Sequence, residues 1–121
     1  MNEAIQRLRR VSDAYEAKVG ESASLYEVAA RAEADYRAER AKAVLRHKAT
    51  RDRMSVAEAE TRADADNQVY QLHTDRLVSA ALAEAHKDRL RQLKEREASC
   101  RTEVTTEREA DRIHAVRGDR A

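Results

Sequence analysis

The chain has 121 residues, of which 39% are charged, and its 24 basic side chains nearly balance its 23 acidic ones. It contains no proline, phenylalanine or tryptophan and only two glycines, and its composition favours long helices over a mixed globular fold. The near-neutral net charge argues against intrinsic disorder and against a dedicated nucleic-acid-binding domain. The single cysteine excludes an intramolecular disulfide framework and suits a reducing compartment.

Targeting and membrane signals are not recognisable in the sequence. The N-terminal stretch lacks the apolar core of a signal peptide. The longest apolar stretch, residues 77–85, is interrupted by Ser79 and Glu84 and is shorter than the roughly 18 residues that a membrane span needs. We therefore expect a cytoplasmic protein without a membrane partner.

The first expected helix covers residues 3–18. Gly20 follows it, at a position where helices commonly end through a left-handed residue. We therefore expect the first arm to be interrupted near Gly20. The apolar residues of this helix recur at spacings of three and four, which places them on one face: Ile5, Leu8, Val11, Tyr15 and Val19.

A capping box predicts the start of the second helix. Ser24 and Glu27 match the S-x-x-E pattern, in which each side chain satisfies a free backbone N–H. An apolar stripe then recurs at heptad-like spacing as far as Met54. We expect a second helix over residues 25–53, followed by a turn at 54–55.

A second capping box, Ser55 with Glu58, predicts the start of the third helix. Apolar residues continue at alternating spacings of three and four, so the expected helix covers residues 56–116. The threonine-containing run 102–106 has lower helix propensity, which leaves a break within 99–106 as an open alternative.

These helices predict an all-α fold, with one long antiparallel helical hairpin of coiled-coil type in a single elongated domain over residues 1–121. If the chain turns at 54–55, two residues that face each other across the hairpin have numbers that sum to about 109. Most apolar residues of the first arm then face apolar residues of the second. The charges agree with this fold. Residues 37–53 carry seven basic side chains and two acids, whereas residues 58–66 carry four acids and one arginine.

No catalytic or metal-binding motif is recognisable. The chain lacks a glycine-rich phosphate loop and the G-x-S-x-G, C-x-x-C and H-E-x-x-H patterns. Its four histidines have no partner at i, i+4 spacing, so no metal site is expected. Cys100 falls on the apolar stripe, which favours a small buried thiol; a reactive thiol activated by the nearby Arg96 and Arg101 is the alternative. We predict a protein that is not an enzyme and uses no cofactor, metal or small-molecule substrate.

The third helix carries more apolar surface than one partner helix covers. Leu77, Val78 and Leu82 lie outside the strict heptad line, so the apolar surface wraps around the helix there. We predict a homodimer, or docking onto a larger protein, through the region 69–93. The expected interface residues are Val69, Leu72, Leu77, Val78, Leu82, Leu90 and Leu93.

A basic stretch supports a second interpretation, because arginines on a helix can follow a nucleic-acid backbone. Overall neutrality favours the alternative, in which these side chains face acids of the opposing helix. Two further basic clusters lie at residues 7–10 and 87–101. The candidate nucleic-acid-binding residues are Arg37, Arg40, Lys42, Arg46, Lys48, Arg51 and Arg53.

Three segments together resemble a loose family of proteins: Leu25-Tyr26-Glu27, Ala32-Glu33-Ala34-x-Tyr36-Arg37, and the turn Met54-Ser55-Val56-Ala57-Glu58-Ala59-Glu60. The pattern, over about residues 20–115, is similar to small helical-hairpin proteins encoded in early regions of tailed-phage genomes, often beside replication and recombination genes. This resemblance implies an accessory role in phage DNA metabolism and transfers no site residues.

The leading hypothesis is therefore a non-enzymatic coiled-coil interaction protein that forms a homodimer and serves as an adaptor for a larger machine. Two alternatives remain. One is a nucleic-acid-binding accessory protein that uses the basic arm 37–53, and the other is a phage inhibitor that masks a host enzyme.

Overall fold

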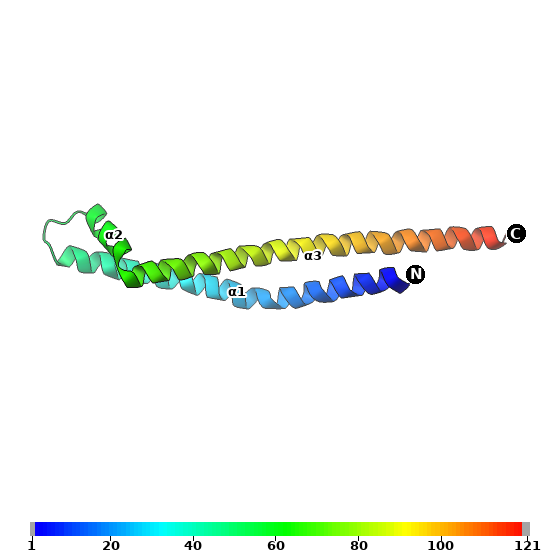
Figure 1. Cartoon of the computed structure of the whole chain (residues 1–121), viewed down its shortest axis with the longest axis horizontal. Coiled ribbons are helices and arrows are strands. Elements are labelled where there is room, and N and C mark those ends of the chain that lie inside the picture. The colour runs from blue at the N-terminus through cyan, green and yellow to red at the C-terminus, as the bar shows by residue number, and fades with distance from the viewer. Residues whose placement is uncertain (1, 120–121) are drawn as a thin grey trace. The chain divides into compact units, whose positions relative to one another are not determined.

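The computed structural model describes residues 2–119, and these residues form three α-helices and no strand. They are α1 (Asn2–Ala49), α2 (Val56–Ala65) and α3 (Asn67–Asp119) (Figure 1). The chain divides into two compact units. Unit 1 consists of Met1–Glu21 with His86–Ala121, and unit 2 consists of Ser22–Ala85. The two long helices thus contribute to both units, while α2 belongs to unit 2 alone.

The expected interruption near Gly20 is wrong, because α1 is continuous from Asn2 to Ala49. No glycine among the described residues has a positive φ, so Gly20 adopts an ordinary helical conformation. A single glycine costs a helix only about 1 kcal/mol relative to alanine, which the strong helix formers on both sides outweigh. Ser24 lies inside the helix, and Glu27 pairs with Arg31 at 2.9 Å instead of capping.

The turn lies close to its expected place, but α1 ends four residues earlier than expected, at Ala49. Residues 50–55 connect it to α2, with a backbone hydrogen bond from Met54 N–H to the Arg51 carbonyl at 3.2 Å. The second capping residue is confirmed. Ser55 has extended backbone geometry, and its Oγ accepts a hydrogen bond from Glu58 N–H at 3.1 Å.

The expected third helix is divided in two at Asp66. This residue is extended (φ −61°, ψ 133°), and its N–H donates to the Ala63 carbonyl at 3.0 Å. Its own carbonyl accepts from Tyr70 N–H at 2.9 Å, so Asp66 ends α2 and begins α3. Across the unit, His47 Nε2 lies 3.1 Å from the Asp66 carboxylate, which holds the junction against α1.

No break occurs within 99–106, since α3 runs without interruption from Asn67 to Asp119. The threonine hydroxyls bond back to the preceding turn. Thr102 Oγ1 donates to the Ala98 carbonyl at 3.1 Å, and Thr105 Oγ1 donates to the Arg101 carbonyl at 3.0 Å. Because these hydroxyls are satisfied along the helix itself, threonine is tolerated here.

Unit 2 has a core of small side chains. Ala43, Ala63 and Val69 form its buried cluster, with Tyr36 and Val44 packed against it. Of the described residues, Val69 is the one large side chain that is fully buried, at 1% exposure. Within the unit α1 and α3 run antiparallel. Glu33 contacts Arg76 and Tyr36 contacts His73, two pairs whose numbers both sum to 109.

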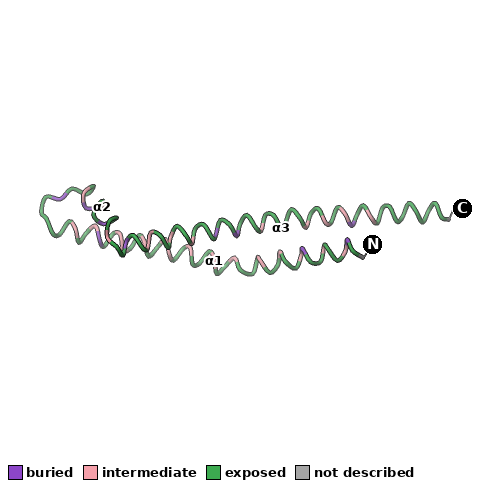
Figure 2. The backbone as a smooth tube through the Cα atoms, viewed as in Figure 1, coloured by how far each residue is buried: buried purple, intermediate pink, exposed green. Residues whose placement is uncertain are grey.

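Unit 1 is built from the first turns of α1 and the second half of α3. Its buried residues alternate with exposed ones along both helices (Figure 2). Arg7 and Glu103 form an ion pair between the two helices. The buried side chains are Ala4, Val11, His86, Leu93 and Val104.

Candidate interaction surface

A polar cluster fixes how α1 faces α3 within unit 2. The Tyr36 and His73 rings have centroids 5.0 Å apart, and the guanidinium carbon of Arg76 lies 4.5 Å from the Tyr36 centroid. Arg76 Nη1 donates to Glu33 Oε2 at 3.2 Å. Partial desolvation raises the pKa of Glu33, but hydrogen bonds from Arg37 and Arg76 outweigh it and leave this pKa below its usual value. These directional contacts favour one register over a slipped one.

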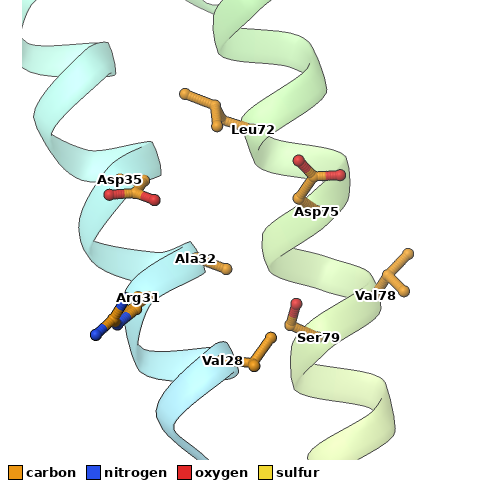
Figure 3. Close-up of a pocket in the computed structure, with 8 residues that line it drawn as sticks. All are labelled: Val28, Arg31, Ala32, Asp35, Leu72, Asp75, Val78 and Ser79. Atoms are coloured by element: carbon orange, nitrogen blue, oxygen red, sulfur yellow. The ribbon is translucent and has the colours of Figure 1, made fainter. Parts of the chain in front are cut away.

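Beside this cluster, a groove of about 420 Å³ runs between α1 and α3 within unit 2. Figure 3 shows Val28 and Ala32 from α1, and Leu72 and Ser79 from α3, directed into the space between the two ribbons. Three further side chains, Arg31, Asp35 and Val78, stand along its two edges. The groove therefore has an apolar floor and a mixed rim.

Large apolar side chains in and beside the groove are still reached by water. Val28 and Val78, which line it, are 52% and 54% exposed, and Leu82, which is not among its lining residues, is 55% exposed. Leu82 lies one helical turn after Val78, so both project from the same side of α3. Nothing in the described residues of unit 2 covers this face.

Charged side chains of both signs accompany these apolar ones. Arg31 pairs with Glu27 on its own helix, and both side chains are largely exposed. Asp35 and Asp75 form no ion pair within residues 2–119. Arg31 and Asp35 lie one turn apart on the same edge of the groove.

The seven expected interface residues do not form one surface. Val69 and Leu93 are buried inside their own units, at 1% and 2% exposure, so they are core residues. Leu72 and Leu90 are half-buried in the helix–helix contacts. Leu77, Val78 and Leu82 are exposed, as an interface with a partner requires. The set is also divided between the two units, since Leu90 and Leu93 belong to unit 1.

The basic arm 37–53 is largely matched with acids. Arg40 Nε lies 2.8 Å from Asp64 Oδ1, and this hydrogen bond lowers the pKa of Asp64 and raises that of Arg40. Three more arginines have acidic neighbours: Arg37 with Glu33 at 2.8 Å, Arg46 with Glu39 at 3.5 Å, and Arg51 with Glu58 at 3.3 Å. Lys42, Lys48 and Arg53 form no ion pair within the described residues.

Base stacking beside this arm is also restricted. One face of Tyr36 is covered by Arg76, and its ring packs against His73. A nucleic-acid base therefore has no access to the full face of this tyrosine.

The described residues contain no group of three or more His, Cys, Asp or Glu side chains that could hold a metal ion. Cys100, a free thiol, is partly buried in unit 1. Nor does any helix in the described part of the chain combine the length and apolar character needed to cross a membrane.

Val28 was not expected at the interface. It falls outside the stripe of Leu25, Ala29, Ala32 and Tyr36, and the sequence signal was this off-stripe position of a large β-branched residue. In general, a residue beside the apolar stripe lies at the edge of a two-helix contact, where it can contact a third helix.

Comparisons of the chain with models of protein families, with curated proteins and with solved structures found no match.

Proposed function

We propose that this protein is a non-enzymatic helical interaction protein that forms a homodimer through the groove of unit 2. In this proposal the two long helices act as one antiparallel hairpin along the whole chain, and two hairpins associate side by side. The dimer would serve in the cytoplasm as an adaptor for a larger protein. The resemblance to phage helical hairpins favours a machine of DNA replication or recombination as that larger protein.

One observation carries the proposal: in unit 2 several large apolar side chains are more than half exposed, whereas most of the buried residues are alanines. The buried cluster consists of Ala43, Ala63 and Val69. Val28, Val78 and Leu82 are each more than half exposed. The exposed parts of these side chains contribute no hydrophobic stabilisation to the single chain, and a partner at the groove would bury them.

The size of this contribution can be bounded. Full burial of a valine or leucine side chain contributes about 1.5–3 kcal/mol, so covering the exposed half contributes about half of that per residue. Three such residues on each of two copies give about 5–9 kcal/mol before the cost of association. We therefore expect a reversible dimer that dissociates on dilution.

The charges on the rim favour a second copy over an unrelated partner. A two-fold axis that passes between positions 31 and 35 brings Arg31 of one copy opposite Asp35 of the other, and the reverse pair forms by symmetry. The same edge thus supplies both signs of charge. Asp35, which has no ion pair in the single chain, then acquires one.

Nucleic-acid binding by the arm 37–53 has less support, because acids of the same chain occupy Arg37, Arg40, Arg46 and Arg51. Masking of a host enzyme would use the same apolar groove as the dimer. Binding of such an enzyme would then compete with self-association of the chain, and this competition would identify the enzyme.

The test compares two aspartate substitutions at exposed apolar positions. Val78→Asp places a carboxylate in the groove, whereas Leu45→Asp does so at a position that is 69% exposed and outside the groove. Each substitution acts twice in a symmetric dimer, so Val78→Asp should weaken self-association by about 2 kcal/mol or more, roughly 30-fold. Sedimentation equilibrium measures this directly, with Leu45→Asp expected to match the wild type.

A charge exchange tests the symmetry. Asp35→Arg alone should weaken the dimer, because position 35 of each copy then carries the same charge as Arg31 of the opposite copy, which gives two repulsive pairs. Adding Arg31→Glu should restore it. Equal self-association of all three proteins would show that this rim does not lie at the interface.

A further inference from the structure

A second hollow lies in unit 1, and its lining residues include none of those that line the groove of unit 2. It has a volume of about 370 Å³ and is bordered by four arginines, two from each helix. Arg7 and Arg10 come from α1, and Arg89 and Arg96 come from α3. The sequence separates these residues by about eighty positions, and the fold brings the two basic clusters to one site.

Most of these arginines are not neutralised by the chain itself. Arg7 pairs with Glu103. Arg10, Arg89 and Arg96 form no ion pair within residues 2–119. The segments 7–10 and 87–101 together contain nine basic residues and three acids, and among these Arg91 pairs with Asp88 and Arg101 with Glu97. In the basic arm of unit 2 the pairing is more extensive, because four of its five arginines have an acidic neighbour.

The floor of the hollow offers little apolar area to a ligand. Val11 and Leu93 lie there, but the helix–helix contact already covers them to 7% and 2% exposure. A ligand would therefore be recognised by its charge. No aromatic side chain is among the residues that line the hollow, so stacking of unpaired bases is not available.

We propose that the arginine-lined hollow of unit 1 binds the phosphate backbone of double-stranded nucleic acid, without sequence preference. Guanidinium groups bind phosphate oxygens in a bidentate manner. Arg89 and Arg96 are seven residues apart, which is about 10.5 Å along a helix. Phosphates follow one another every 3.4 Å along the axis in each strand, so arginines this far apart would contact different phosphates of the duplex.

This activity belongs to unit 1 and does not depend on the dimer proposed for unit 2. It also assigns nucleic-acid contact to different residues from the arm 37–53. The sites can be distinguished by the salt dependence of binding, because each phosphate contact contributes about −0.9 to the slope of log K against log salt.

The experiment is fluorescence anisotropy of the full chain with a labelled DNA duplex between 50 and 200 mM salt. Three free arginines predict a slope of about −2.7, which is about a 40-fold loss of affinity over this range. Arg10→Gln, Arg89→Gln and Arg96→Gln should each make the slope shallower by about 0.9. Arg96→Lys should keep it, since the charge is retained.

Matched controls come from unit 2. Arg37→Gln and Arg46→Gln change exposed arginines that are already paired, and they should leave the slope unchanged. Circular dichroism of all variants should be equal, because these side chains are on the surface. A slope that responds to Arg37 and Arg46 but not to Arg10, Arg89 and Arg96 would overturn the proposal. Binding of labelled polyglutamate without duplex binding would also overturn it, and would assign the hollow to an acidic protein segment.

Discussion

Replacement of Gly20 by alanine tests the continuity of α1. Gly20 is exposed in the middle of a 48-residue helix, and it does not have a positive φ. A β-carbon added at this position meets no other atom within 4 Å. Nothing in the structure therefore opposes the substitution, and alanine reduces the conformational freedom of the unfolded chain.

The expected gain is the difference in helix propensity, about 0.8–1 kcal/mol. For a chain of this size that gain raises the Tm by about 4 °C. Thermal unfolding followed by circular dichroism at a fixed protein concentration measures the shift. Gly20→Pro should have the opposite effect, with a loss of about 3 kcal/mol, because the ring removes a backbone donor and clashes with the preceding turn.

Gly118→Ala is the matched control. It also meets no atom within 4 Å, but it lies in the last turn of α3, where the helix end frays. Its effect on the Tm should therefore be much smaller than that of Gly20→Ala. Destabilisation by Gly20→Ala would refute this reasoning and would indicate a left-handed glycine, as the sequence alone predicts.

Three further predictions concern unit 2. Val69→Ala should cost about 2 kcal/mol or more in urea unfolding, because it removes two methyl groups from a side chain that is only 1% exposed; an unchanged midpoint would mean that the core of unit 2 lies elsewhere. Ser55→Ala should cost about 1 kcal/mol in the same assay through loss of the cap on Glu58 N–H, while Ser55→Thr should not. The pKa values of Asp64 and Glu33 are lowered in the folded state, so their contribution to stability is present above about pH 4.5 and is lost as the pH falls through the folded-state values. The Tm should therefore drop between pH 5 and pH 3, and less so in Asp64→Asn.

The helical fold could be predicted from periodicity, because a stripe at spacings of three and four repeats along nearly the whole chain. Ser55 was also identifiable, since its capping pattern coincides with the end of a basic stretch. The helix end predicted at Gly20 and the helix start predicted at Ser24 were wrong, because such local signals are weak and the long apolar stripe on both sides outweighs them.

The junction at Asp66 could not be predicted from the stripe alone. Aspartate followed by asparagine favours a helix start, but the decisive contact is with His47, nineteen positions earlier. Long-range contacts of this kind leave no periodic trace in the sequence.

The exposed apolar residues of α3 could be predicted from the sequence, because Leu77, Val78 and Leu82 lie off the apolar stripe. The rest required the fold. Val28 becomes relevant only when α1 and α3 are placed side by side in unit 2. Two other features also depend on which helix segments are neighbours. One is the set of ion pairs made by the basic arm 37–53, and the other is the position of Arg10 and Arg96 beside the same hollow of unit 1.

The central claim is that the chain associates with a second copy of itself. Light scattering on a sizing column, with injected concentrations from about 1 to 100 µM, measures it most directly. One chain has a mass of 13.8 kDa. We predict a mass that approaches twice this value at high concentration and falls towards it on dilution. For Val78→Asp the same rise should need about 30-fold higher concentration, so its mass should stay well below that of the wild type at high concentration. A wild-type mass of 13.8 kDa at every concentration would contradict the account.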